Sequence, residues 1–280
     1  MKNLIRTLVI VAGGIWFAGC QQGRDAYAVT TTDTLIRFDT AKPNNISAEM
    51  PITGLAAGET LRQIDFRPAD KVLYGITSAN RLVTVNTTTG ATTAVGAGPF
   101  TTNPLAAAVM DFNPVGDYLR VINFVSGGAN NSIFRVNADT GVIIQTDGNG
   151  TLTFATNDAH QGEVPQLAAI AHSNNKSDAT STTLYGLDIT TQGLVSITVG
   201  GVLTTIHTTS RGFTANAGFD IVPNNDKAYV AIADRTGVAR FYNFSLTDGS
   251  VTSGNDIGSN RQVRSIAVTL DEPKRSGFNF

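Results

Sequence analysis

The sequence predicts an all-β chain folded as a β-propeller of five four-stranded blades. A block with one pattern recurs along the 280 residues, and its first element starts at Ile64, Met110, Ile170, Phe219 and Ile266. These starts are 46, 60, 49 and 47 residues apart, which is near the length of a propeller blade. Helical periodicity is nearly absent, whereas short β-branched and aromatic runs are bounded by Gly, Asn, Asp and Pro.

The first predicted strands along the chain belong to a blade that is split between the two termini. Residues 26–29, 35–39 and 46–52 match the second, third and fourth elements of the block, while residues 263–269 match the first element. One blade cannot cover both faces of its own sheet, so it must pack against a neighbour on each side. A blade built from both ends therefore closes the ring.

Two complete copies of the block follow. The first copy comprises residues 64–68, 73–75 and 82–85, and the second comprises residues 110–114, 119–121 and 133–136. After each third element, an early Asn and a final Gly, at Gly90 and Gly141, predict a tight turn that leads into the fourth strand.

Two degenerate copies complete the ring. Their second and third elements are residues 184–186 and 194–197 in one copy, and residues 228–230 and 240–244 in the other.

The longest departure from the repeat, residues 147–166, precedes these copies. Asp147, Asn149 and Asp158 resemble the spacing of an oxygen-rich calcium loop, but Leu152 stands where that loop needs Gly. We treat the three residues as weak calcium candidates and expect a polar insertion.

The N-terminus resembles a bacterial lipoprotein signal peptide. Lys2 and Arg6 precede an apolar run that is too short for a membrane-spanning helix and ends in Ala18, Gly19 and Cys20. We expect a signal peptide at 1–19, a lipid on Cys20, a tether at 20–25, a propeller at 26–272 and a polar tail at 273–280. The alternative is a plain secretory signal with an incidental thiol.

Composition excludes several kinds of site and partner. Cys20 is the only cysteine, so the mature domain has no internal disulfide and no thiolate zinc site. The chain has 20 basic and 22 acidic side chains, which predicts no nucleic-acid partner. The three histidines are scattered, and we expect each to be a surface or capping residue. The familiar nucleophile-elbow, zinc-protease and phosphate-loop motifs are missing, and we expect a monomer without a cofactor.

Three aspartates recur at one position of the first strand. Asp65, Asp111 and Asp220 hold this position in three blades, and Ala171 and Ala267 hold it in the other two. First strands line the channel of a propeller, so the three carboxylates either gather to bind a cation or ligand, or each accepts hydrogen bonds from amides of its own blade. Their repetition in degenerate blocks favours the structural role.

The paired motifs resemble a family of bacterial exported domains of unknown function, of the DUF4394 type. The resemblance rests on residues 64–68 with 73–75, on residues 110–114 with 119–121, and on residues 182–186. It covers most of the chain and implies no established activity, so it assigns no role to any residue.

These observations favour a lipid-anchored extracytoplasmic propeller that binds or scaffolds an envelope protein, glycan or small ligand. The membrane is the expected partner of the lipid. Gln21 after the cysteine matches outer-membrane delivery if the cell is Gram-negative. The alternative is a hydrolase- or lyase-type enzyme with a carboxylate and arginine site at the channel mouth. Its candidate residues are Asp65, Asp111, Asp220 and Arg120.

Overall fold

The computed structural model describes most of the chain from residue 23 to residue 272. The described ranges are 23–101, 107–124, 132–147, 151–209, 211–223, 225–233 and 237–272. The predicted signal peptide, Cys20, Asn149 and the predicted tail at 273–280 lie outside the described residues. No helix in the described ranges has the length and apolar character needed to cross a membrane.

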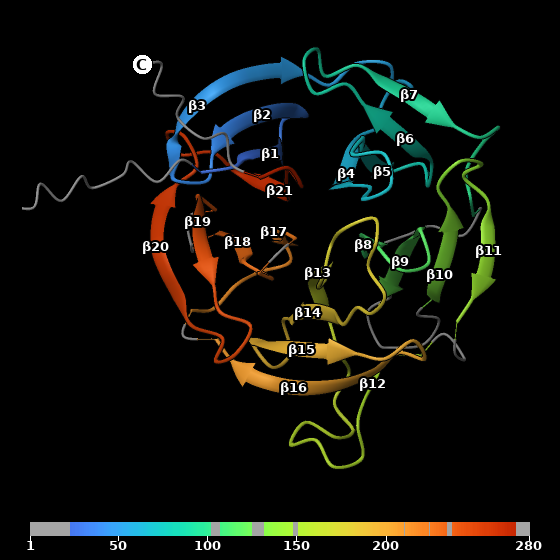
Figure 1. The fold of residues 1–280 in the computed structure, drawn as a ribbon, viewed down its shortest axis with the longest axis vertical. Coiled ribbons are helices and arrows are strands. Elements are labelled where there is room, and N and C mark those ends of the chain that lie inside the picture. Colours follow the sequence, from blue (N-terminus) through green and yellow to red (C-terminus); the bar gives the residue numbers. More distant parts are fainter. Residues whose placement is uncertain are drawn as a thin grey trace, which may run out of the picture.

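Five sheets, antiparallel except for one short pair, are arranged in a ring around a common axis, which confirms the five-bladed propeller (Figure 1). Blade 1 contains, from the channel outward, β4 (Leu61–Phe66), β5 (Leu73–Thr77), β6 (Leu82–Val85) and β7 (Thr92–Val95). Blade 2 contains β8 (Ala107–Asn113), β9 (Tyr118–Phe124), β10 (Ser132–Asn137) and β11 (Ile143–Thr146).

The degenerate copies also form complete blades. Blade 3 contains β13 (Leu167–His172), β14 (Leu184–Asp188), β15 (Gly193–Ile197) and β16 (Val202–Thr208). Blade 4 contains β17 (Ala217–Ile221), β18 (Ala228–Ala233), β19 (Ala239–Phe244) and β20 (Val251–Asp256). Blade 3 has one strand more than predicted, because β12 (Thr153–Phe154) of the insertion pairs in parallel with β16.

Blade 5 closes the ring with strands from both termini. Its inner strand is β21 (Val263–Val268), followed outward by β1 (Asp25–Thr30), β2 (Thr34–Asp39) and β3 (Lys42–Pro51). Ala26 pairs with Val268 and Ala28 pairs with Ile266. The first strand of the chain is thus held between the last strand and β2, which confirms the predicted closure.

The hydrophobic core lies between the blades. Five clusters of buried side chains each join one pair of neighbouring blades. Between blades 1 and 2, the rings of Tyr74 and Phe112 meet edge to face with centroids 5.2 Å apart. Between blades 4 and 5, Phe38 and Phe241 meet in the same way at 5.2 Å. Each blade therefore depends on both neighbours for its burial.

Two kinds of glycine make the arrangement possible. Gly90 and Gly141 have φ angles of 75° and 67° and end the predicted turns between third and fourth strands. Gly218 has a different role, because a Cβ there would lie 2.7 Å from the backbone nitrogen of Ile266 in the next inner strand. The absence of a side chain lets β17 and β21 approach closely.

Candidate functional site

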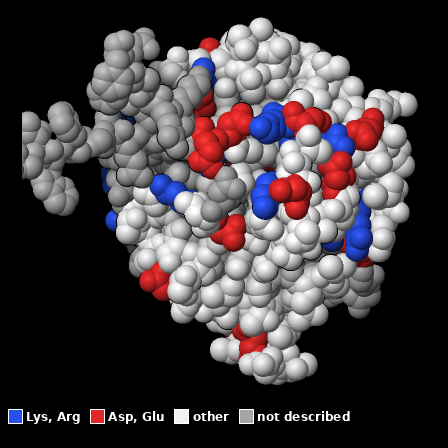
Figure 2. Space-filling model, viewed as in Figure 1, with Lys and Arg blue, Asp and Glu red and all other residues white. Residues whose placement is uncertain are grey.

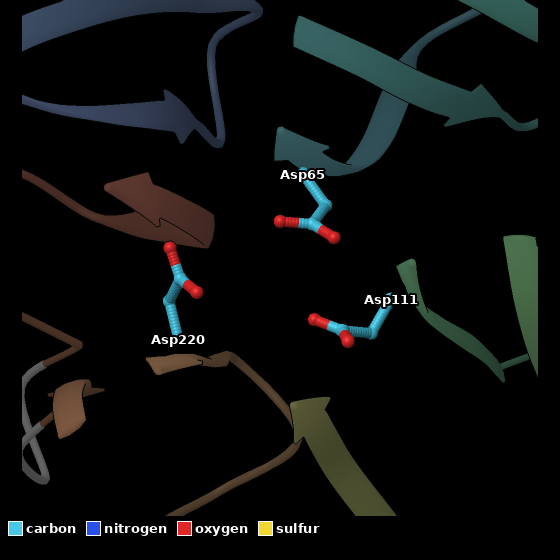
Figure 3. A group of neighbouring side chains, drawn as sticks. All are labelled: Asp65, Asp111 and Asp220. Atoms are coloured by element: carbon cyan, nitrogen blue, oxygen red, sulfur yellow. The ribbon is translucent and has the colours of Figure 1, made fainter. Parts of the chain in front are cut away.

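The three repeated aspartates converge inside the channel (Figure 3). Asp65 lies on β4, Asp111 on β8 and Asp220 on β17. One carboxylate oxygen of each lies within 4.8 Å of the other two, and the residues are only 3%, 2% and 2% exposed. The structure thus brings together side chains that are separated by up to 155 positions in the sequence.

Each carboxylate accepts a hydrogen bond from the following blade. The amide of Phe112 donates to Oδ2 of Asp65 at 2.8 Å, and the amide of His172 donates to Oδ2 of Asp111 at 2.8 Å. The amide of Val268 donates to Oδ2 of Asp220 at 2.5 Å. These three bonds join adjacent blades, whereas the sequence interpretation considered bonds within a blade, of which the Phe66 amide to Asp65 is one.

The two blades without an aspartate explain the pattern further. Blade 3 has Ala171 at the aspartate position, so the amide of Ile221 in blade 4 has no carboxylate to bind on the blade before it. Blade 5 has Ala267 there, and the amide of Phe66 in blade 1 is in the same situation. Phe66 instead donates to Oδ1 of Asp65 on its own strand at 2.7 Å. The amide of Ile221 holds the corresponding position beside Asp220 on its own strand and lowers the pKa of that carboxyl. The three carboxylates therefore accept hydrogen bonds from the equivalent amides of four of the five inner strands.

Burial and mutual repulsion make the ionised forms of these carboxyls unfavourable. Desolvation raises the pKa of Asp220 to about 7. Desolvation, followed by the charge of Asp220, raises the pKa of Asp65 well above its ordinary value. The pKa of Asp111 is raised well above its ordinary value by burial and then by Asp65. A site of this kind holds a proton or another positive charge more readily than an exposed carboxylate does.

His172 is buried beside Asp111, and its expected role as a surface or capping residue is wrong. It is 2% exposed, and burial together with the charge of Arg120 lowers its pKa to about 3. The neutral ring can donate from Nδ1 to Oδ2 of Asp111, 2.6 Å away. No sequence pattern indicated this contact, because His172 holds the position that Phe112 holds in the preceding blade.

Arg120 does not join the three carboxylates. Its guanidinium forms an ion pair with Asp147 and donates to the hydroxyl of Tyr118 at 3.1 Å. Arg135 binds the same Asp147 oxygen at 2.7 Å. Asp147 is therefore the partner of two arginines.

The other described calcium candidate has separate partners. Asp158 accepts a hydrogen bond from the amide of Thr205 at 2.6 Å and another from the amide of His160 at 2.9 Å. The hydrogen bond from Thr205 attaches the insertion to β16. Among the described residues, the acidic group with metal-binding geometry consists of Asp65, Asp111 and Asp220.

A cavity of about 360 Å³ opens at the other end of the channel. The cavity is lined by the first residues of all five inner strands or by the residues just before those strands. Its polar side chains include Arg62, Gln63, Asn216 and Arg264. Arg264 donates to Asp33 at 2.6 Å and to the carbonyl of Thr31 at 2.7 Å. Because the cavity is lined by the starts of the strands and the aspartates lie near their ends, the two features are separate.

Charged side chains on one face of the ring are mixed in sign, as Figure 2 shows. Arg67 illustrates the local pattern, since it binds Asp117 at 2.6 Å and Asp139 at 2.7 Å across blades 1 and 2. This face presents no broad area of a single charge.

The family comparison agrees with the architecture. A family model described as a domain of unknown function, DUF4394, matches residues 34–267. The chain belongs to this family. No curated protein matches the DUF4394 chain significantly.

Solved structures similar to this DUF4394 propeller are diverse and show the fold alone. A crystal structure of a nidogen/laminin complex has 12% identity and a TM-score of 0.50, and the match covers 89% of this chain and 99% of that one. TolB from Acinetobacter baumannii has 15% identity and a TM-score of 0.47, with 88% and 64% covered. AofleA from Arthrobotrys oligospora has 14% identity and a TM-score of 0.46, with 88% and 74% covered.

Proposed function

We propose that this DUF4394 propeller is a lipid-anchored binding or scaffolding module of the cell envelope. In this proposal the lipid is attached to Cys20, and the cavity at the channel mouth receives a glycan or another small polar ligand, or part of an envelope protein. In a Gram-negative cell the anchor would lie in the outer membrane. The observation that carries the proposal is the position of the cavity relative to the N-terminal tether.

Strand β1 begins at the end of the ring that holds the aspartates. Strand β1 begins at Asp25, and its residue Ala26 pairs with Val268 at the end of β21. Residues 20–24 span at most about 17 Å when extended. A lipid on Cys20 would therefore keep this end of the channel near the membrane and leave the cavity facing away from it.

The cavity suits a small polar ligand better than a large apolar one. Its volume of about 360 Å³ lies at the lower end of the usual range for ligand pockets, about 300–1,000 Å³. Amide and guanidinium groups from Gln63, Asn216 and Arg264 line it beside small residues such as Ala107 and Ala108. Five inner strands form its wall, so the site is held by the most buried part of the fold.

The enzyme alternative has less support from this geometry. Its three carboxylates are buried and hydrogen-bonded to backbone amides, and its arginine, Arg120, is paired with Asp147. The cavity at the channel mouth is lined by other arginines and lies at the opposite end from the carboxylates.

The anchor is tested by detergent-phase partitioning of wild type and Cys20→Ser from whole cells. Acyl chains contribute about 0.8 kcal/mol of membrane affinity per buried CH₂, so the wild type should enter the detergent phase and the variant should not. Equal partitioning of the two proteins would show that Cys20 carries no lipid.

The binding site is tested on a glycan array with wild type and Asn216→Trp. Asn216 is exposed at the cavity, so an indole there should obstruct the cavity with little effect on folding. The matched control is Asn45→Trp on the outer strand β3, which is also exposed. We expect binding to be lost only in Asn216→Trp. Unchanged binding in that variant would exclude the cavity, and no binding by the wild type would contradict a glycan ligand.

A further inference from the structure

The three channel aspartates form few contacts with positive charges: Arg24 acts on Asp220 from a distance, and its charge lowers the pKa of that carboxyl. Among the described residues, no Lys or Arg forms an ion pair with Asp65, Asp111 or Asp220, and the contact recorded for Asp111 is with the ring of His172, whose Nδ1 lies 2.6 Å from Oδ2. Carboxylates this close repel one another strongly in a buried site. Either protons or a cation must neutralise part of their charge.

One oxygen in the group is buried without any partner. Oδ1 of Asp220 has no hydrogen-bond partner among the described residues, although Asp220 is 2% exposed. Oδ2 of the same carboxylate is occupied by the amide of Val268. Figure 3 shows one oxygen of Asp220 near β21 and the other directed toward Asp65 and Asp111. A buried oxygen that faces two other carboxylates can coordinate a cation together with them.

We propose that Asp65, Asp111 and Asp220 together bind one calcium ion between the inner strands of the propeller. The ligand set consists of carboxylate oxygens, which hard divalent cations prefer, whereas zinc sites in proteins usually include histidine or cysteine. The cation would join blades 1, 2 and 4, which provide one aspartate each. This inference concerns the end of the channel opposite the cavity, and it does not rest on the proposed function.

The composition of the ligand set favours calcium over magnesium, and the spacing of the oxygens is compatible with calcium. Calcium binds oxygen at about 2.3–2.6 Å, so two ligands on opposite sides of the ion are separated by about 4.6–5.2 Å. The three ligand atoms, which lie within 4.8 Å of one another, fit that limit. Magnesium usually keeps several waters and binds through only one or two carboxylates, whereas calcium accepts a larger set of protein oxygens. The carboxylates are also bonded to strand amides, which restricts their movement toward a smaller ion.

The test is calorimetric titration of the chelator-treated full chain with CaCl₂, and separately with MgCl₂, at neutral pH. We expect one calcium site per chain, weaker magnesium binding, and a higher Tm in calcium because a ligand that binds only the folded state stabilises it. Asp220→Asn keeps an oxygen for the Val268 amide but removes the charge, and it should weaken calcium binding by at least about tenfold. The matched control is Asp178→Asn, whose carboxylate is 79% exposed, and it should bind as the wild type does.

A wild-type chain that shows neither calcium binding nor a calcium-dependent Tm would overturn the proposal and would leave the carboxyls neutralised by protons. Equal binding by Asp220→Asn and wild type would also overturn it. If Asp220→Asn does not fold, wild-type crystals soaked in Tb³⁺, a calcium substitute, give the decisive measurement. An anomalous peak among the three aspartates supports the site, and peaks found only elsewhere refute it.

Discussion

Deletion of residues 261–280 should destroy the cooperative fold, because it removes the inner strand of blade 5. The deletion removes β21 and leaves blades 1 to 4 complete in sequence. Val263, Ile266 and Val268 are 1%, 2% and 0% exposed. Burial of each such side chain contributes about 1.5–3 kcal/mol, so their loss costs about 5–9 kcal/mol. That is comparable to the whole stability of a typical domain, about 5–15 kcal/mol.

The lost strand also has specific polar partners. Ser265 Oγ accepts a hydrogen bond from the amide of Ile64 at 3.1 Å, and the Val268 amide donates to Asp220. Deletion leaves both partners without these bonds and exposes the edge of β1.

Circular dichroism melts and urea titrations of the shortened chain, alongside a control that ends at Glu272, measure the effect. The control keeps β21 and should melt close to the wild type. If the chain that ends at Asn260 melts cooperatively near the wild-type temperature, the ring does not depend on its split blade.

Two further predictions concern single residues. Gly218→Ala should lower the free energy of unfolding by about 1–3 kcal/mol, because its Cβ would lie 2.7 Å from the Ile266 nitrogen. Urea titration measures this against Gly200→Ala, whose Cβ meets nothing within 4 Å, and equal stability of the two variants would contradict the close approach. Glu59 should stabilise the fold at neutral pH, because Arg81 lowers the pKa of its carboxyl to about 2. This stabilisation is fully present above the ordinary pKa of Glu and is lost as the pH falls toward 2. The Tm difference between wild type and Glu59→Gln should therefore shrink in acid. A Tm difference independent of pH would show that Glu59 acts without its charge.

The repeat predicted the blades because each strand has its own local signal. Residues 263–269 were predicted as the inner strand of the split blade, and the structure places β21 at Val263–Val268. The degenerate copies were recognisable from apolar runs alone, since every inner strand must bury both faces between neighbours. Strand β12 was not predictable in the same way, because two residues without a repeat partner carry no periodic signal.

The candidate site was only partly predictable. The repeated position identified Asp65, Asp111 and Asp220, and closure of the ring implied that they lie near one channel. The amides that donate hydrogen bonds to these aspartates are determined by the stagger between adjacent inner strands. The sequence of one blade does not contain that information. The ion pair of Arg120 with Asp147 was not predictable for a related reason, since Asp147 lies in a segment that departs from the repeat.

The place of β1 within blade 5 determines how the ring would respond to mechanical force. A pull on the N-terminal end acts on the first residues of β1, which has hydrogen-bonded neighbours on both sides, β21 and β2. A load along this strand is therefore shared by two ladders in shear, whereas a pull on an outermost strand such as β3 would open a single ladder one bond at a time. The split blade thus gives the N-terminal strand more resistance to extraction than an outermost strand would have, and the proposed lipid anchor would pull on this strand.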